Sequence, residues 1–243
     1  MTLEEIINYR RSVRHYDPEK PIDAEKVKLC IEQATLAPNS SNMQLWGFYH
    51  VTRPDVLKEI AAACFDQMSA TTARQMVVFV TRQDLHKTRA KQMMELEKQN
   101  VLKNSPPEKQ QKRIKRWEQY YGMVMPLLYS RLFGAIGFLR KFGAVAVGLF
   151  RPTMYQVSES DIRVVVHKTC GLAAQTFMLA MANQGYDTCP MEGFDSRRVK
   201  NILGLPFGAE INMIVSCGIR MDNGKGIWGD RMRVPFDEVY KQI

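Results

Sequence analysis

The segment Arg10-Arg11-Ser12-Val13-Arg14 follows a short predicted helix near the start of the 243-residue chain. Alternate side chains of an extended segment point to the same side, so we expect Arg10, Ser12 and Arg14 to converge on one anion. Arginine suits phosphate because its planar guanidinium donates hydrogen bonds in pairs. The segment therefore predicts an anion-binding site close to the N-terminal end.

Two distant segments carry the same kind of chemistry. Between a predicted helix and a predicted strand lies the stretch Ala37-Pro38-Asn39-Ser40-Ser41-Asn42-Met43-Gln44-Leu45-Trp46, whose short amide and hydroxyl side chains suit a ligand-facing loop. Near the other end of the chain, Arg231 and Arg233 again place two guanidinium groups at alternate positions. Each feature alone is more typical of a solvated junction or a turn. Only their combination indicates a site.

Composition limits the classes of protein to consider. Lys and Arg number 34 against 25 Asp and Glu, a net charge of +9, and 45% of residues are hydrophobic. The hydrophobic share is ordinary for a folded domain, and the charge suits nucleic acid, an anionic membrane surface or a small anionic ligand. The five cysteines lack C-x-x-C spacing and indicate neither disulfides nor zinc. The acidic start does not resemble a signal peptide, so a cytoplasmic protein is expected.

Capping residues and hydrophobic periodicity predict helices alternating with strands, and hence a layered α/β or α+β domain. Residues 86–152 differ in character and indicate a helical excursion from the core of one domain spanning 1–243. Helices are expected from Thr2, from Asp23 to about Ala37, over 87–103 and 109–121, from Ser158 to Gly185 and from Asp195 or Ser196 to about Gly204; strands are expected over 45–51, 76–81 and 210–219.

Two local patterns suggest cofactor or metal chemistry but lack the context they require. Residues 224–229 match G-x-G-x-x-G, yet no helix is predicted after them, as a dinucleotide site needs. A glycine turn is expected instead. His167 and Cys170 lie three residues apart on one helix, and no further ligand is placed to complete a metal site. We expect no bound metal.

The basic excursion supports an alternative from a different class, a protein that binds nucleic acid or an acidic membrane. Residues 109–116 are rich in Lys and Arg and precede Trp117, a combination that suits phosphates and stacked bases. Glu108 and Glu118 flank this stretch, which favours a solvated helix face. Residues 127–150 are apolar but interrupted by three basic residues, which argues against a membrane-spanning helix and leaves a surface-lying or lid helix.

Taken together, the motifs resemble the nitroreductase-like flavoprotein family. In order along the chain come Arg-Arg-Ser-Val-Arg, Ala-Pro-x-Ser-x-Asn-x-Gln-x-Trp, a loop at 190–195 (Pro-Met-Glu-Gly-Phe-Asp) after a long helix, and Arg-x-Arg near the end. The resemblance covers residues 4–81 and 167–240. It implies an α+β fold with a central, mostly antiparallel sheet flanked by helices, and an intertwined homodimer with non-covalent FMN at the subunit interface.

The resemblance also implies which residues bind the flavin. Arg10 and Ser12, with the arginine pair near the end, would hold the phosphate and ribityl chain, and Arg14 would stabilise negative charge at the pyrimidine end. Residues 38–42 would reach the partner subunit's flavin, and the Gly193 N–H would face N5. The full set is Arg10, Arg11, Ser12, Arg14, Pro38, Asn39, Ser40, Asn42, Pro190, Met191, Glu192, Gly193, Arg231 and Arg233.

The activity implied by this resemblance is flavin-centred. NAD(P)H would reduce the FMN and leave, and a nitroaromatic or quinone-type acceptor would then take the electrons, a ping-pong cycle without a catalytic acid–base side chain. Reductive dehalogenation and flavin reduction are alternatives within the family. No nucleic acid partner is expected, and at most peripheral membrane contact through 127–150. A further flavin contact is expected between residues 65 and 76, with Arg74 and Gln75 as candidates.

Overall fold

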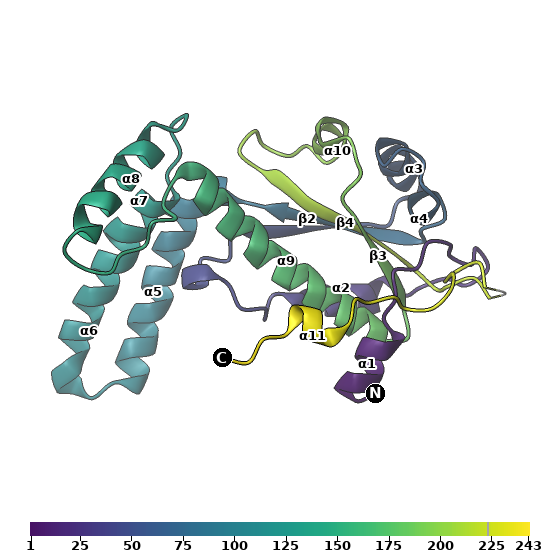
Figure 1. The fold of residues 1–243 in the computed structure, drawn as a ribbon, viewed down its shortest axis with the longest axis horizontal. Helices are drawn as coiled ribbons and strands as arrows, with labels where there is room; N and C mark the ends of the chain where they lie inside the picture. Colours follow the sequence, from purple (N-terminus) through teal and green to yellow (C-terminus); the bar gives the residue numbers. More distant parts are fainter. Residues whose placement is uncertain (223) are drawn as a thin grey trace.

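The computed structural model describes residues 1–222 and 224–243 (Figure 1). Its elements in chain order are α1 (Leu3–Tyr9), α2 (Ala24–Ala34), the 3-10 turn η1 (Ser40–Asn42), β1 (Trp46–Val51), α3 (Pro54–Ala63), α4 (Met68–Thr71), β2 (Gln75–Thr81), the 3-10 turn η2 (Gln83–Leu85), α5 (His86–Asn104), α6 (Pro107–Gln119), the π-helical turn η3 (Tyr120–Val124), α7 (Met125–Tyr129), α8 (Ala135–Gly148), α9 (Glu159–Asn183), β3 (Asp187–Met191), α10 (Ser196–Ile202), β4 (Glu210–Gly218) and α11 (Phe236–Val239).

One antiparallel sheet forms the centre of the molecule, with strand order β1-β2-β4-β3. Every residue of β2 is buried. Val77 and Phe79 belong to the hydrophobic cluster on one face, whereas Met76 and Val78 belong to the cluster on the other. Because successive strand side chains point to opposite faces, both faces must be covered by helices. The predicted α+β fold with helices flanking an antiparallel sheet is confirmed.

The two covering layers are visible in Figure 1. Helices α2 and α9 pack on one face, where Cys30 and Phe177 join the cluster around Phe79. Helices α3 and α10 cover the other face, where Ile60 and Val199 join the cluster around Val78. Among the described residues, α9 is the one helix that is long and apolar enough to cross a membrane. Its buried side chains pack in the core instead.

The predicted helix starts are confirmed by their caps. Thr2 and Ser158 each form a capping box with the acidic residue three positions on, and the Asp23 and Asp195 side chains accept hydrogen bonds from first-turn N–H groups. These contacts satisfy backbone donors that no helical carbonyl reaches. The end predicted near Ala37 is wrong, because α2 stops at Ala34.

The sequence patterns did not predict α3, α4 or β3. Pro190 and Met191 were expected in a loop, but they lie in β3, paired with Val215 and Ile214 of β4. Asp, Thr, Cys and Pro form no apolar run, so β3 has no strand-like periodicity. Proline is tolerated there because β3 lies last in the sheet order, where not every backbone N–H is needed for pairing.

The segment 10–16, which contains the first predicted motif, lies along β3. Val13 is fully buried and its N–H donates to the Thr188 carbonyl at 3.1 Å, while the neighbouring side chains of Ser12 and Arg14 are exposed. The buried Tyr16 hydroxyl lies 2.9 Å from the Ser216 Oγ. The outward orientation predicted for the side chains at positions 12 and 14 is therefore confirmed. The buried side chains of Val13 and Tyr16 hold this segment against the sheet.

Replacing Gly218 by Ala tests this attachment. A Cβ at Gly218 would lie 2.6 Å from the Tyr16 ring, which is fully buried and has no room to move away. We expect Gly218→Ala to lower the free energy of unfolding by about 1–3 kcal/mol, as overpacked cores do, measured by urea unfolding. Gly143→Ala is the control, because its Cβ meets nothing within 4 Å in α8; equal stability of the two variants would contradict the packing described.

The excursion 86–152 forms one end of the elongated molecule (Figure 1). Met93, Tyr121 and Met125 pack against Met43 and the loop before β1. At the start of β4, Glu210 accepts hydrogen bonds from Arg131 at 2.8 Å and from Arg163 of α9. The hydrogen bond with His167, followed by those from the two arginines, holds the pKa of the Glu210 carboxyl far below its usual range. The excursion is thus tied to the sheet by both apolar and ionic contacts.

Candidate functional site

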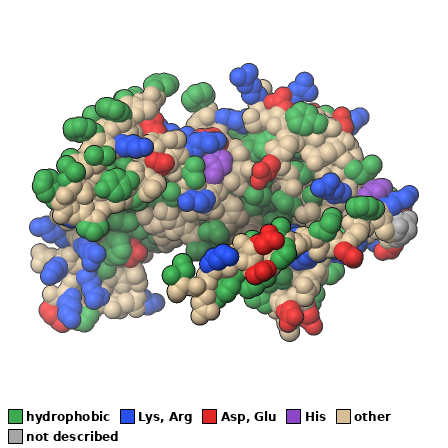
Figure 2. Space-filling model, viewed as in Figure 1, with side chains coloured by type: hydrophobic (Ala, Val, Ile, Leu, Met, Phe, Trp, Pro, Cys, Tyr) green, Lys and Arg blue, Asp and Glu red, His purple; other side chains and the backbone are tan. Residues whose placement is uncertain are grey.

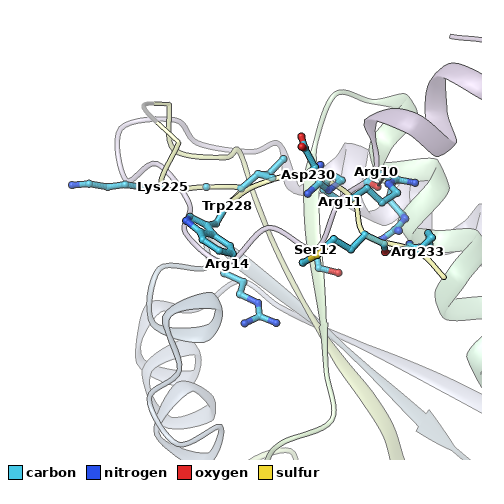
Figure 3. Close-up of a pocket in the computed structure, with 12 residues that line it drawn as sticks. Arg10, Arg11, Ser12, Arg14, Lys225, Trp228, Asp230 and Arg233 are labelled. Atoms are coloured by element: carbon cyan, nitrogen blue, oxygen red, sulfur yellow. Dashed lines mark hydrogen bonds between the residues drawn. The ribbon is translucent and has the colours of Figure 1, made fainter. Parts of the chain in front are cut away.

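A cavity of about 420 Å³ opens between the N-terminal segment and residues 225–233 (Figure 3). These two stretches lie more than 200 positions apart in sequence and meet beside the start of β3. Six of the predicted site residues line the cavity together: Arg10, Arg11, Ser12, Arg14, Arg231 and Arg233. The first and third predicted motifs therefore form one site.

The cavity is strongly cationic. None of its five arginines forms an ion pair with a carboxylate anywhere in residues 1–222 or 224–243. Burial and the positive charges of Arg231 and Arg233 lower the pKa of Arg10 from its usual value. Unpaired cations that repel one another across a cavity are stabilised by an anion placed between them. The site thus suits a phosphate or another multiply charged anion.

The five arginines do not play equal parts. Arg231 Nη2 donates to the carbonyls of Ile7 (3.0 Å), Asn8 (3.0 Å) and Arg10 (2.8 Å), which have no helical partner at the end of α1. Arg11 donates to the Gly229 carbonyl at 3.0 Å. In contrast, the side chains of Arg10 and Arg14 donate to no protein group in the described structure. Arg231 therefore shapes the site, while Arg10 and Arg14 keep free donors.

The far wall of the cavity is the glycine-rich turn at 224–229, which the sequence predicts as a turn but not as part of a site. Gly224 and Gly229 have φ angles of +76° and +65°, so the predicted turn is confirmed. A Cβ at Gly226 would lie 2.8 Å from the Met221 carbonyl. Trp228 and Lys225 from this turn line the cavity, and Trp228 lies beside Arg14 (Figure 3). A basic and an aromatic residue between glycines are the sequence signal for this wall.

Residues at the end of β3 form a second part of the candidate site. Glu192 and Gly193 are exposed, and the Gly193 carbonyl accepts a hydrogen bond from Gln67 at 3.1 Å. The Gly193 N–H has no partner among the described residues. Glu192 follows Thr188, which lies beside Ser12, by four positions of extended chain, or about 13 Å. An elongated ligand anchored at the arginines would have to cover that length to reach Gly193.

The structure also places three other side chains of this region. The Met191 side chain is buried and accepts a hydrogen bond from Ser69 at 3.2 Å, so it does not line the arginine cavity. Gln75 is buried too, and its Nε2 donates to the Ile22 carbonyl. From residues 65–76, which sequence patterns left unassigned, Gln67 is the side chain that reaches the Gly193 edge.

The polar loop with Pro38, Asn39, Ser40 and Asn42 lies apart from the arginine cavity and lines none of it. It is held by the excursion instead: the Ser41 Oγ lies 2.8 Å from the Tyr120 hydroxyl, and the Tyr121 hydroxyl donates to the Ser41 carbonyl. Ser41, Asn42 and Gln44 have positive φ angles near +50°. Non-glycine residues adopt this conformation at an energetic cost and often do so at functional sites.

The two residues considered for a metal site have other roles. The His167 Nε2 lies 3.2 Å from the Glu210 Oε2. Cys170 is buried in the core, where burial raises its pKa to about 12. Within the described residues no group of three or more His, Cys, Asp or Glu side chains is placed to hold a metal ion.

Comparison with known proteins agrees with this arrangement. The chain matches the model of the Nitroreductase family over residues 7–219 and belongs to that family, as its motifs predicted. It is 26% identical over 238 residues to "Putative NAD(P)H nitroreductase YdgI" of Bacillus subtilis, covering 97% of this chain and 94% of that protein.

Solved structures with the same fold include a "putative NAD(P)H:FMN oxidoreductase" from Staphylococcus epidermidis, with a TM-score of 0.74, 22% identity and coverage of 99% of this chain and 95% of that one. A "putative nitroreductase in complex with FMN" from Exiguobacterium sibiricum gives a TM-score of 0.69 at 21% identity, covering 100% and 98% of the two chains.

Proposed function

We propose that the chain is an FMN-dependent oxidoreductase that uses NAD(P)H to reduce nitroaromatic or quinone-type acceptors. The observation that carries this proposal is the cavity lined by five arginines that form no ion pair with a carboxylate of the described residues. The phosphate of a flavin mononucleotide would supply the negative charge that balances these arginines. The relatives named for NAD(P)H and FMN support the same assignment.

The residues present fit FMN along its length. Arg10, Ser12 and Arg233 would hold the phosphate and the adjoining chain, since charged donors bind phosphate strongly. Thr188 Oγ1, close to the backbone of Ser12, is buried and has no hydrogen-bond partner in the described part of the chain. The flavin ring supplies the redox chemistry when it is bound. Arg14 would offset negative charge on that ring, and the free Gly193 N–H would donate to its edge.

A homodimer would complete the site. The loop 38–42 carries the polar side chains expected at a flavin, yet it lies apart from the arginine cavity of its own chain. A second copy would bring this loop to the cavity. The last residues of the chain support such exchange, because Phe236, Val239 and Ile243 are exposed and a partner would cover them.

The remaining parts of the proposal concern the reaction and its setting. One ring face would serve NAD(P)H and the acceptor in turn, which is a ping-pong cycle. The excursion 86–152, as part of one domain spanning 1–243, would border the acceptor pocket. With five buried, unpaired cysteines in the described structure, the protein suits a reducing cytoplasm.

The first test is the visible spectrum of the purified protein, followed by turnover. We expect bound flavin that is released as FMN on denaturation, and oxidation of NADH or NADPH that depends on a nitroaromatic or quinone acceptor. Initial rates at several acceptor concentrations should give parallel double-reciprocal lines. Protein that stays colourless after incubation with FMN would contradict the proposal, and intersecting lines would contradict the ping-pong cycle.

A further inference from the structure

Helix α8 presents an apolar face that none of residues 1–222 and 224–243 covers. Phe138 and Phe142 are 73% and 70% exposed, and Val145 follows on the same side of the helix at helical spacing. The opposite side packs inward through Gly137, where a Cβ would lie 2.6 Å from the Glu159 backbone N. Phe133 and Phe150 flank the helix and are almost fully exposed. A continuous apolar surface of this kind marks an interaction site.

The positive charge of the protein is concentrated in the same part of the chain. Residues 86–152 hold 14 Lys and Arg and four Asp and Glu, a net charge of +10, against +9 for the whole chain. The other residues together carry −1. Between Gln119 and Ser158 the chain has four basic residues and no acidic one. Figure 2 shows Lys and Arg side chains gathered at the excursion end, below apolar side chains on the α8 side.

The geometry favours a surface-lying helix over a spanning one. The 14 residues of α8 reach about 21 Å, which is short of the ~30 Å hydrocarbon core of a bilayer. Lys141 lies between Phe138 and Phe142 on the exposed stripe, and a long basic side chain at that place extends toward lipid headgroups. An apolar stripe bordered by cations is typical of helices that lie in the membrane interface.

A second copy of the chain fits this face poorly. In a two-fold symmetric contact between two α8 helices, the same patch faces itself. Lys141 would then oppose its own copy, and it forms no ion pair among the described residues that would offset its charge. An anionic surface removes this repulsion.

We propose that α8 and the basic face of α6 dock the protein on anionic phospholipid bilayers. The apolar side chains of α8 enter the interface, while Lys112 and Lys115 of α6 contact the headgroups. This role goes beyond the oxidoreductase function and does not depend on it. It does bring the protein to a surface where lipid-soluble acceptors reside.

Flotation of the full-length, FMN-loaded protein with vesicles tests the proposal. We expect binding to phosphatidylglycerol vesicles at least tenfold stronger than to phosphatidylcholine vesicles, and weakened by salt. Phe138→Gln with Phe142→Gln should lower the partition coefficient tenfold or more, and Lys112→Gln with Lys115→Gln roughly tenfold at low salt. Leu3→Gln, at an equally exposed apolar residue of α1 at the other end of the molecule, should leave binding unchanged.

Three outcomes would overturn the docking surface. The first is no flotation with phosphatidylglycerol vesicles, or unchanged flotation of the phenylalanine variant. The second is a phenylalanine variant that sediments as a monomer where the wild type is a dimer, which would make α8 a self-interface. The third is binding of a short DNA duplex that competes with lipid and is lost only in the lysine variant. Circular dichroism of each variant shows that it is folded.

Discussion

Replacing Arg10 and Arg233 together by Ala is expected to weaken FMN binding by about 10²–10⁴-fold. Among residues 1–222 and 224–243, the Arg10 side chain donates to no protein group and the Arg233 Nη1 donates only to the neighbouring Met232 carbonyl, so both have guanidinium donors left for a phosphate. A hydrogen bond to a charged group contributes about 1.5–3 kcal/mol, and each 1.4 kcal/mol is tenfold in affinity. The dissociation constant is measured by titrating flavin-free protein with FMN and monitoring the quenching of flavin fluorescence.

The matched control for this variant is Arg53→Gln. Arg53 is an exposed arginine that pairs with Asp55 at the start of α3 and does not line the cavity. Its FMN affinity should equal that of the wild type. Inorganic phosphate should raise the Tm of flavin-free wild type but not of the double variant, because a ligand stabilises only a state that binds it. If the double variant retained wild-type FMN affinity, the arginine cavity would not be the phosphate site.

Arg14→Gln is expected to slow reduction of the bound flavin by about 10–100-fold while leaving FMN bound. The Arg14 side chain is exposed, donates to no protein group among the described residues and lies beside Trp228 in the cavity (Figure 3). A fixed cation near developing negative charge stabilises the reduced state. Losing about 1.4–2.8 kcal/mol of that stabilisation makes the two-electron potential more negative by roughly 30–60 mV. Redox titration of the bound flavin against a reference dye measures this shift.

Arg14→Lys separates charge from shape in this prediction. Lysine keeps the positive charge but loses the planar fork. The reduction potential of the bound flavin in Arg14→Lys should therefore stay close to that of the wild type. Stopped-flow reduction by NADH then reports whether the rate follows the potential. A potential of Arg14→Gln equal to that of the wild type would show that Arg14 acts elsewhere, even if turnover fell.

Sequence patterns predicted the parts of the fold that rest on local chemistry. The capping residues Thr2, Asp23 and Ser158 predicted helix starts because a cap needs only neighbouring residues. The alternation of Ser12, Val13 and Arg14 predicted which side chains point outward. In contrast, β3 has no strand-like composition, and it exists because β4 provides a complete partner edge. Such tertiary pairing leaves no periodic signal.

The same distinction between local chemistry and tertiary contacts applies to the candidate site. Arginines and a serine at alternate positions indicated an anion site, because that chemistry can be recognised in a few residues. That Arg231 would cap α1 could not be predicted, since the carbonyls it contacts lie more than 220 positions away. The parts played by Gln67 and Trp228 depend on how distant loops meet. Sequence therefore indicated the chemistry of the site better than its walls.

The most direct test of the central claim compares FMN with riboflavin, which has the same ring but no phosphate. If the unpaired arginines hold the phosphate, flavin-free wild type should bind FMN at least 10²-fold more tightly than riboflavin. Arg10→Ala with Arg233→Ala should lose most of that preference without weakening riboflavin binding. Equal wild-type affinities for the two flavins, or binding of neither, would contradict the account.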